Sequence, residues 1–284
     1  MSNIVTQPVR QQPIPAGDAM LCPNCQISHM DPFYSVEQIP VHSCLLMQSR
    51  EEALNFPRAD LTLGFCPACG FIGNTRYDAG YRSYSARYEE TQGYSNCFNS
   101  FLENLARKLV DHYELRHKTI LEIGCGKGEF LARLCELGDN RGIGVDPGCI
   151  PNRILSPAAS RIEVIRDYYN DKYAHLPADV VCCRHTLEHI DSTLDFLRML
   201  RRSLGSRTDT LVFFEVPDML RILKEGAFWD IYYEHCSYFS LGSLGRLFRK
   251  AGFNLLDLEL DYNDQYILLI AQPISGRSSI ELEQ

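Results

Sequence analysis

Four of the 12 cysteines occur as two short pairs with the spacing of zinc ligands. CPNC (22–25) is followed by CPAC (66–69), and each pair can present two thiolates from one tight turn. Zinc held by four sulfur atoms has no open coordination position, so we expect a structural zinc bound by Cys22, Cys25, Cys66 and Cys69. Two unrelated turns or a redox pair are the alternative, although no thioredoxin-like context surrounds either pair.

A glycine-rich stretch in the middle of the chain predicts a nucleotide site. TILEIGCGKGEFLARLCEL (119–137) reads as an apolar strand, then Gly124, Gly126 and Gly128, then a helix with one apolar side. Glycines at such a turn let the backbone approach a ligand next to the helix N-terminus. The next strand, RGIGVD, ends at Asp146, whose carboxylate can accept both hydroxyl groups of a ribose.

The stretch FWDIYYEHCSYFS (228–240) has no counterpart elsewhere in the chain. It combines the single Trp and several other aromatic residues with a Glu-His pair, which can move a proton near neutral pH. We expect Phe228, Trp229 and Phe239 in the core or in the wall of a pocket, and Cys236 in packing. A second aromatic stretch, 77–94, is either a lid over the substrate or a layer of tyrosines between two domains.

Alternating strands and helices must position these groups. The periodicity predicts a helix through Phe98–Leu109, helices at 194–204 and 240–253, and a hairpin over 254–273. It also predicts three strands: one within 162–170 that leads to Asp167 and Tyr168, one within 179–190 that ends at Arg184 and His185, and one within 210–217 that ends at Glu215. This order predicts an α/β fold with a doubly wound sheet, whose ligands lie at the carboxyl ends of the strands. Glu188 and His189 are expected to anchor the start of a helix.

Glu122, the glycine loop and the acidic strand end together resemble the class I S-adenosylmethionine-dependent methyltransferases. The resemblance implies a Rossmann-like sheet that ends in an antiparallel hairpin, with a loop beside the adenine after the third strand. A nucleotide-binding fold for another cofactor is the alternative. The cofactor-binding residues that this family implies are Glu122, Gly124, Gly126, Gly128, Asp146, Asp167, Tyr168 and His185.

EVP (215–217), the segment 228–253 and the four cysteines resemble the zinc-containing sugar C-methyltransferases, which act on nucleotide-linked deoxyketosugars. The resemblance implies that Tyr232, Glu234 and His235 line the acceptor site and that His235 is the general base. Methylation of a carbon beside a ketone needs such a base and a group that stabilises the enolate oxygen. The sequence departs from the family at Tyr233, where a His is usual, and in having no counterpart of the family's C-terminal domain.

Composition helps to choose between functions. The net charge is −8, and the first 72 residues hold six acidic and three basic side chains, which disfavours a zinc-ribbon RNA methyltransferase or any nucleic-acid partner. The favoured hypothesis is C-methylation of a ketosugar or related natural-product intermediate, a small-molecule acceptor. O- or N-methylation in secondary metabolism is the alternative, and a cofactor-binding protein without turnover is a third hypothesis.

The predicted organisation has five parts: a disordered tail (1–20), a zinc-ribbon domain (21–74), a Tyr-rich lid with a helical bridge (75–117), the methyltransferase domain (118–275) and a tail (276–284). No apolar run reaches the ~18 residues of a membrane span. The first residues lack the apolar core of a secretory signal. We therefore expect a cytoplasmic protein without a membrane partner.

Overall fold

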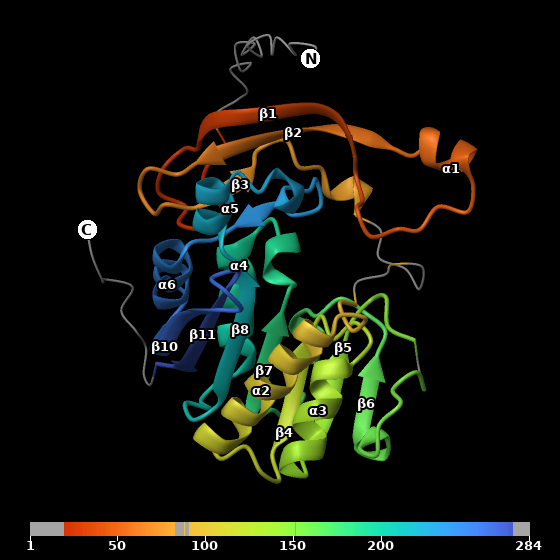
Figure 1. Ribbon diagram of the computed structural model, residues 1–284. Coiled ribbons are helices and arrows are strands. Elements are labelled where there is room, and N and C mark those ends of the chain that lie inside the picture. Colours follow the sequence, from red (N-terminus) through yellow and green to blue (C-terminus); the bar gives the residue numbers. More distant parts are fainter. Residues whose placement is uncertain (1–19, 83–87, 89–90, 151, 275–284) are drawn as a thin grey trace.

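The computed structural model describes residues 20–82, 88, 91–150 and 152–274, which form one large and one small sheet (Figure 1). All but Met20 of the two expected tails, and residues 83–87 and 89–90 of the expected lid, lie outside the described residues. Among the described helices, none has the length and apolar composition to cross a membrane.

The large sheet of the described chain has seven strands in the order β10-β11-β8-β7-β4-β5-β6. Five neighbouring strands are parallel, and the pair β10–β11 is an antiparallel hairpin joined to β8. The doubly wound α/β sheet with a terminal hairpin is thereby confirmed. The strands are β4 (Thr119–Ile123), β5 (Arg141–Val145), β6 (Ile162–Ile165), β7 (Val180–Arg184), β8 (Leu211–Pro217), β10 (Phe253–Asp261) and β11 (Tyr266–Pro273).

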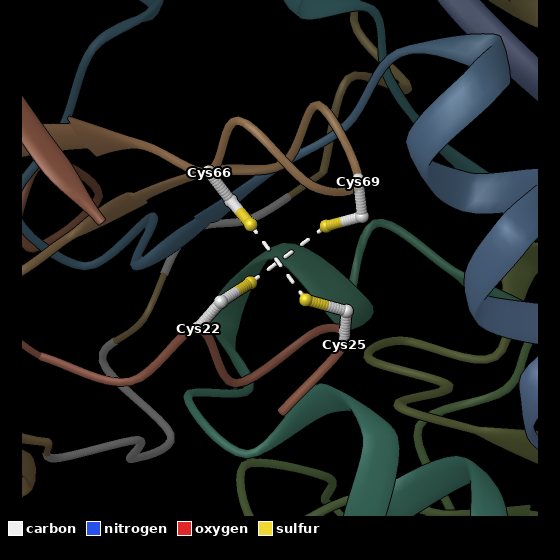
Figure 2. Close-up of side chains that lie close together, drawn as sticks. All are labelled: Cys22, Cys25, Cys66 and Cys69. Atoms are coloured by element: carbon white, nitrogen blue, oxygen red, sulfur yellow. Dashed lines mark hydrogen bonds between the residues drawn. The ribbon is translucent and has the colours of Figure 1, made fainter. Parts of the chain in front are cut away.

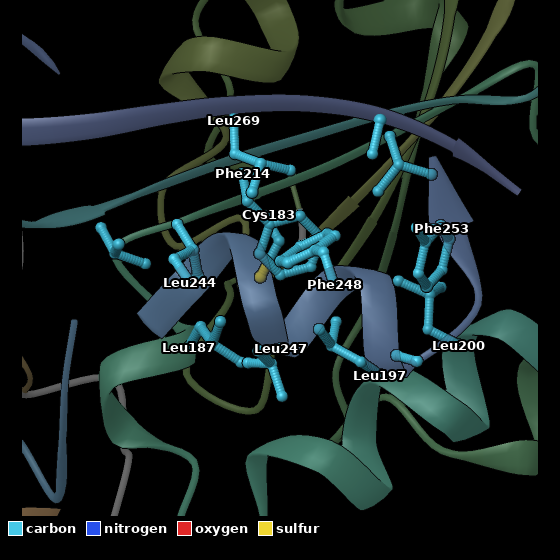
Figure 3. Packing of buried hydrophobic residues seen from close by; sticks show 14 of the residues in the cluster. Cys183, Leu187, Leu197, Leu200, Phe214, Leu244, Leu247, Phe248, Phe253 and Leu269 are labelled. Atoms are coloured by element: carbon cyan, nitrogen blue, oxygen red, sulfur yellow. The ribbon is translucent and has the colours of Figure 1, made fainter. Parts of the chain in front are cut away.

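Helices cover both faces of the large sheet because its parallel strands are apolar on both faces. Successive residues of β7 point to opposite faces: Cys182 packs in the cluster of α2 (Asn96–His112) and α3 (Glu129–Gly138), and Cys183 packs with α4 (Thr193–Ser203) and α6 (Leu241–Lys250). Figure 3 shows the second cluster, in which Phe248 of α6 meets Phe214 of β8 with ring centroids 4.9 Å apart.

Local signals fix where the helices begin. Ser95 caps α2 by accepting a hydrogen bond from the Phe98 amide, and Ser240 and Ser243 form a reciprocal capping box at α6. Short 3₁₀ helices occupy the connections: η1 (Ala79–Tyr81), η2 (Ala159–Arg161), η3 (Asp171–Tyr173), η4 (Leu187–His189) and η5 (Phe228–Asp230).

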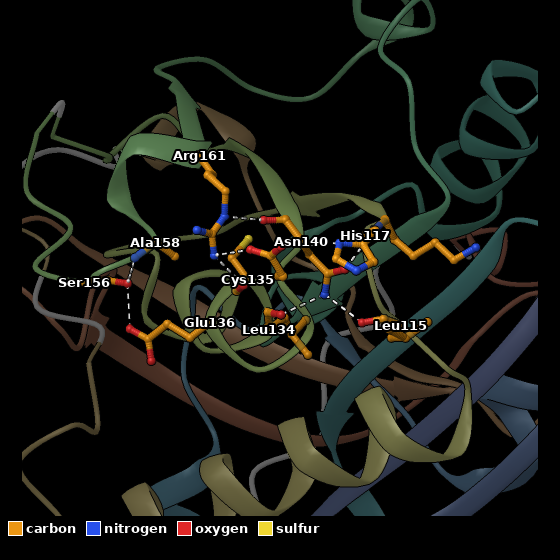
Figure 4. Close-up of polar contacts among 11 residues, drawn as sticks. Leu115, His117, Leu134, Cys135, Glu136, Asn140, Ser156, Ala158 and Arg161 are labelled. Carbon is orange, nitrogen blue, oxygen red and sulfur yellow. Dashed lines mark hydrogen bonds and ion pairs between the residues drawn. The ribbon is translucent and has the colours of Figure 1, made fainter.

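A buried asparagine ties the outer end of α3 to the sheet (Figure 4). The Asn140 amide group donates to the carbonyl oxygens of Leu115 and Leu134 at 2.9 and 2.8 Å, and its Oδ1 accepts from the Lys118 amide at 2.9 Å. Arg161 then donates to the Asn140 carbonyl oxygen at 3.1 Å. These bonds hold the amino-terminal ends of β4 and β5, which lie opposite the expected ligand site.

The small sheet lies across the carboxyl ends of the large one (Figure 1) and has the strand order β1-β2-β3-β9 in the described residues. Its strands are antiparallel: β1 (Asp31–Pro40), β2 (Arg58–Phe65), β3 (Ile72–Asn74) and β9 (Ser237–Tyr238). The chain also forms α1 (Arg50–Leu54) and α5 (Met219–Glu225), and α5 packs Met219 and Ile222 against Leu61 and Leu63 of β2. The sequence analysis predicted neither α5 nor the partnership of β9 with the N-terminal strands.

Candidate active site

A cavity of about 810 Å³ opens at the carboxyl ends of the central strands, and loop residues of the N-terminal part, such as Cys44 and Arg82, also line it. Of the predicted cofactor residues, six line it: Glu122, Gly124, Gly126, Asp146, Tyr168 and His185. Two of the three predicted acceptor residues, Tyr232 and His235, line the same cavity. The glycine loop and His235, more than a hundred residues apart in the chain, therefore share one cavity.

The glycine loop has a backbone that other residues rarely adopt. Gly124, Gly126 and Gly128 have φ angles of 71°, 50° and 74°. A Cβ on Gly124 would lie 2.0 Å from Oγ1 of Thr186, so no larger residue fits there. Gly128 does not line the cavity but is the N-cap of α3, so it sets the direction in which the helix leaves the loop.

Asp146 follows β5 and is held by two backbone amides. Its Oδ2 accepts from the Gly126 amide at 3.0 Å, and its Oδ1 accepts from the Gly148 amide at 2.7 Å. Each carboxylate oxygen has a second lone pair for another donor. The carboxylate is therefore pre-oriented beside the glycine loop, where a ribose diol could donate to it.

Glu122 is a buried carboxyl group in the wall of the cavity. Burial raises its pKa to about 8, against the opposing effect of the Arg184 guanidinium. Its Oε2 has no hydrogen-bond partner among the described residues. The group is therefore protonated at neutral pH in the protein alone, and it offers a polar contact to a bound ligand.

Tyr168 and Asp167 follow β6 but take different positions. Tyr168 lines the cavity, and the Arg82 guanidinium carbon lies 5.6 Å from the centre of its ring, a cation–π contact. Asp167 is not among the lining residues, and its Oδ2 contacts Lys172 and accepts from the Tyr173 hydroxyl at 2.7 Å. The sequence analysis did not single out Arg82, which comes from the predicted lid.

A buried ion network lies at the ends of β7 and β8. Arg184 donates to both carboxylate oxygens of Glu215, at 2.6 and 3.0 Å, and His185 Nε2 lies 2.8 Å from Glu215 Oε1. Burial alone would raise the pKa of Glu215, but the Arg184 and His185 charges lower it to about 2. The Glu215 carboxylate raises the pKa of His185 to about 9 in spite of burial. His185 has a φ of 47°, so the strand end is turned sharply towards the cavity.

Three rings meet at the predicted acceptor site. The imidazole of His235 lies edge-on to Tyr232 and to His189, with ring centroids 4.7 Å apart in both pairs. Burial, and then the neighbouring His189, lower the pKa of His235 to about 3, so the ring is neutral at pH 7 but a weaker base than the sequence led us to expect. Glu188 and His189, which were expected to anchor the start of the next helix, both line the cavity, and α4 begins after a different residue, its N-cap Ser192.

Glu234 faces away from the cavity. It is 3% exposed, and its Oε2 lies 2.6 Å from Nδ1 of His42. Its Oε1 accepts from the hydroxyl groups of Ser43 and Tyr88. No pattern in the sequence marks His42, a single histidine in a loop before α1, as the partner of this carboxylate.

Tyr233 is a core residue. It is 2% exposed, its ring contacts Tyr77 and Tyr81, and its hydroxyl accepts from the Asp78 amide at 2.9 Å. The described tyrosines at 77 and 81 therefore pack between the two parts of the chain, one of the two alternatives for this stretch.

The other residues singled out in the segment 228–240 are either buried or exposed. Phe239 is fully buried and Cys236 is 4% exposed, as expected. Phe228 and Trp229 are 70% and 57% exposed and do not line the cavity, so the expectation of core or pocket wall is wrong for both. They lie in η5, which follows α5 and has no buried residue.

The four predicted zinc ligands form one buried cluster beneath the small sheet. Sγ of Cys22 lies 3.7 Å from Sγ of Cys69, and Sγ of Cys25 lies 3.6 Å from Sγ of Cys66. Figure 2 shows these two lines crossing, as opposite edges of a tetrahedron do. Zinc–sulfur bonds of about 2.3 Å at tetrahedral angles put the sulfur atoms roughly 3.8 Å apart, so the thiols fit a zinc ion.

Comparisons with known proteins agree with this geometry. The family model described as "Methyltransferase domain" matches residues 98–258. C-methyltransferase NovU of Streptomyces niveus is 32% identical over 165 residues, which are 55% of this chain and 38% of that protein. The match thus spans well under half of the relative's length.

Solved structures show more distant likenesses. An O-methyltransferase family protein from Burkholderia thailandensis is 18% identical with a TM-score of 0.49 and covers 63% of this chain and 59% of that one. The 1,6-didemethyltoxoflavin-N1-methyltransferase of the same organism, solved with its substrate and S-adenosylhomocysteine, is 17% identical with a TM-score of 0.46, covering 64% and 83%.

The chain belongs to the methyltransferase domain family. The glycine loop and Asp146 lie at the carboxyl ends of β4 and β5, where ligands of doubly wound sheets bind.

Proposed function

We propose that the protein transfers a methyl group to a carbon next to a carbonyl group in a small, sugar-like natural-product acceptor. The observation that carries the proposal is the sharing of one cavity by Asp146, beside the glycine loop, and by Tyr232 and His235. The similarity to a relative whose name is C-methyltransferase supports carbon as the methylated atom.

The lining residues fit S-adenosylmethionine. Asp146 would accept the ribose hydroxyl groups, the glycine loop would follow the methionine part, and Tyr168 would lie against the adenine. When bound, the sulfonium group supplies an electrophilic methyl. Asp167 remains a predicted contact of the adenine amine, although its carboxylate is already engaged by Lys172 and Tyr173.

His235 is proposed to take the proton from the acceptor carbon. Its ring lies in the cavity wall and is held edge-on between Tyr232 and His189, which limits its rotation. Tyr232, which lines the same cavity, would donate a hydrogen bond to the developing enolate oxygen. Glu234 acts at a distance by holding the segment in place through His42.

We also propose that zinc binds the four thiols and is structural. All four thiol residues are buried, and none lines the cavity. Asn24 Nδ2 lies 3.7 Å from Sγ of Cys69 and donates at 3.2 Å to the Ser243 carbonyl oxygen in α6. The metal cluster would thereby fix the N-terminal part to the methyltransferase sheet.

Transfer of a ¹³C-labelled methyl group tests the proposed reaction. Nucleotide-linked ketodeoxysugars and phenolic natural products are incubated with the labelled cofactor, and the product is examined by NMR. The proposal expects coupling between the labelled methyl and a ring carbon that lay next to the ketone. Label attached only to oxygen or nitrogen would establish the O- or N-methyltransferase alternative instead.

A further inference from the structure

A second group of metal-ligating side chains lies in the cavity itself, apart from the four thiols. Glu188, His189 and His235 each place one ligand atom within 4.8 Å of the other two. We propose that these three residues bind a divalent transition-metal ion at the acceptor end of the cavity.

The donor set suits such an ion. Two imidazoles and one carboxylate bind Zn²⁺, Fe²⁺, Co²⁺ or Mn²⁺ and leave coordination positions open for water or a substrate. Bonds of about 2.1 Å at tetrahedral angles put ligand atoms roughly 3.4 Å apart, so small side-chain rotations close the set. Because all three residues line the cavity, the open positions of the ion would face an acceptor.

The ring of His189 is oriented as metal-bound histidines are. Its Nδ1 lies 3.2 Å from the backbone carbonyl oxygen of Glu234, so Nδ1 carries the hydrogen in that contact. This tautomer has the lone pair on Nε2. The carbonyl belongs to the residue that precedes His235, so one short segment both orients one ligand and supplies another.

The carboxylate of Glu188 gives an independent sign of a ligand. The residue is 2% exposed, and its Oε2 has no hydrogen-bond partner among the described residues. A buried carboxylate oxygen without a donor is costly. His185 Nδ1 lies 3.7 Å from the other oxygen, Oε1, which leaves Oε2 for a cation.

The ion would determine which acceptors bind. An acceptor with a hydroxyl or enol group could place that oxygen on an open position, and the oxygen–hydrogen bond would break with the proton passing to water. While His235 is a ligand, the same nitrogen cannot take a proton, so the ion-bound protein would hold an acceptor without C-methylation and the proposed reaction would need the ion-free protein. The effect of the ion on acceptors rests on the proposed function, whereas ion binding does not.

Cobalt titration tests the site without any turnover. The full chain, with zinc retained at the thiols, is titrated with Co²⁺ and followed by calorimetry and visible absorption. One Co²⁺ per chain is expected, without the thiolate-to-cobalt charge-transfer band that exchange into the four-thiol site would give. Glu188→Gln should weaken this binding at least tenfold, whereas Glu129→Gln, a carboxylate of the same cavity outside the set, should not change it.

Absence of Co²⁺ binding by the zinc-loaded protein, or equal binding by the Glu188→Gln protein, would overturn the proposal. If Glu188→Gln does not fold, anomalous diffraction from Co²⁺-soaked crystals of the unchanged protein decides instead, with a peak between the three side chains expected. Co²⁺ binding is measured without turnover, so a protein that does not C-methylate could still bind the ion. The two proposals can therefore be refuted independently.

Discussion

Nδ1 of His42 lies 2.6 Å from Oε2 of Glu234, although 192 residues separate the two in the chain. Nε2 of the same ring lies 3.1 Å from the carbonyl oxygen of Tyr81. Both ring nitrogens therefore face acceptors, and in spite of burial the Glu234 carboxylate raises the pKa of His42. The contact is a buried ion pair between the N-terminal part and the segment that carries His235.

Breaking this pair should destabilise the protein. Because removal of one partner leaves a buried charge, we expect His42→Ala and Glu234→Gln each to lower the free energy of unfolding by roughly 3–5 kcal/mol. A double-mutant cycle measured by urea unfolding should show strong coupling. The same cycle on the exposed pair Lys108–Glu259 is the control and should give less than about 1 kcal/mol; equal coupling in both cycles would refute a buried ion pair.

Replacement of His235 should abolish proton removal. With S-adenosylhomocysteine present in D₂O and no added metal, the protein should exchange the proton next to the acceptor's ketone, and His235→Ala should slow this by about 100-fold or more. Trp229→Ala, which alters an exposed residue outside the cavity, should exchange at the normal rate. Undiminished exchange by His235→Ala would remove this residue as the base.

Loss of the Asp146 carboxylate charge should weaken cofactor binding. Hydrogen bonds to a charged group contribute about 1.5–3 kcal/mol, so calorimetry should find S-adenosylhomocysteine bound roughly 10- to 100-fold more weakly by Asp146→Asn. Asp171→Asn, in exposed η3, should bind normally. Identical affinity in both variants would contradict a contact between Asp146 and the ribose.

The protonated Glu122 should make stability depend on pH. The unfolded chain loses this proton near pH 4.5, whereas the folded protein keeps it up to about 8, so the free energy of unfolding falls as the pH rises between these values. The loss amounts to roughly 3–5 kcal/mol. Urea unfolding of Glu122→Gln should match the unchanged protein at pH 4 and exceed its stability at pH 9; a pH-independent difference would argue against the raised pKa.

Zinc should be lost when one thiol is removed. Elemental analysis should find one zinc per chain in the unchanged protein and in Cys97→Ser, whose cysteine is exposed and outside the cluster. Cys66→Ser should retain little zinc and unfold at a lower temperature, because a structural ion contributes its binding free energy to folding. Full zinc content in Cys66→Ser would contradict the four-thiol site.

The sequence predicted the parts of the fold whose signals are local. The strand and helix around Gly124 and Gly128 and the terminal hairpin follow from apolar periodicity and turn residues, and each lies where expected. The spacing of the cysteines predicted a cluster that the structure assembles. Contacts between distant segments carry no such signal, which is why His42 was missed and Glu234 was expected to face the acceptor.

The predicted burial was wrong for Phe228 and Trp229, aromatic side chains whose burial was inferred from residue type alone. Trp229 is large and apolar, but it follows the end of α5, where Gly226 turns the chain outward with a φ of 64°. Tyr233, its near neighbour, became core because the described tyrosines of the N-terminal part pack around it. Whether each ring is buried or exposed depends on packing with residues that are distant in the sequence and come close only in the folded chain.

The pairing of β9 with β3 has a consequence for how the chain is made. Ile72 and Gly73 reach the ribosome exit well before Tyr238 and Ser237, the residues with which they pair. During synthesis the edge of β3 that pairs with β9 stays unpaired until most of the chain has emerged. The last strand of the small sheet therefore arrives together with the residues that line the acceptor site, so the small sheet is completed only when that site forms.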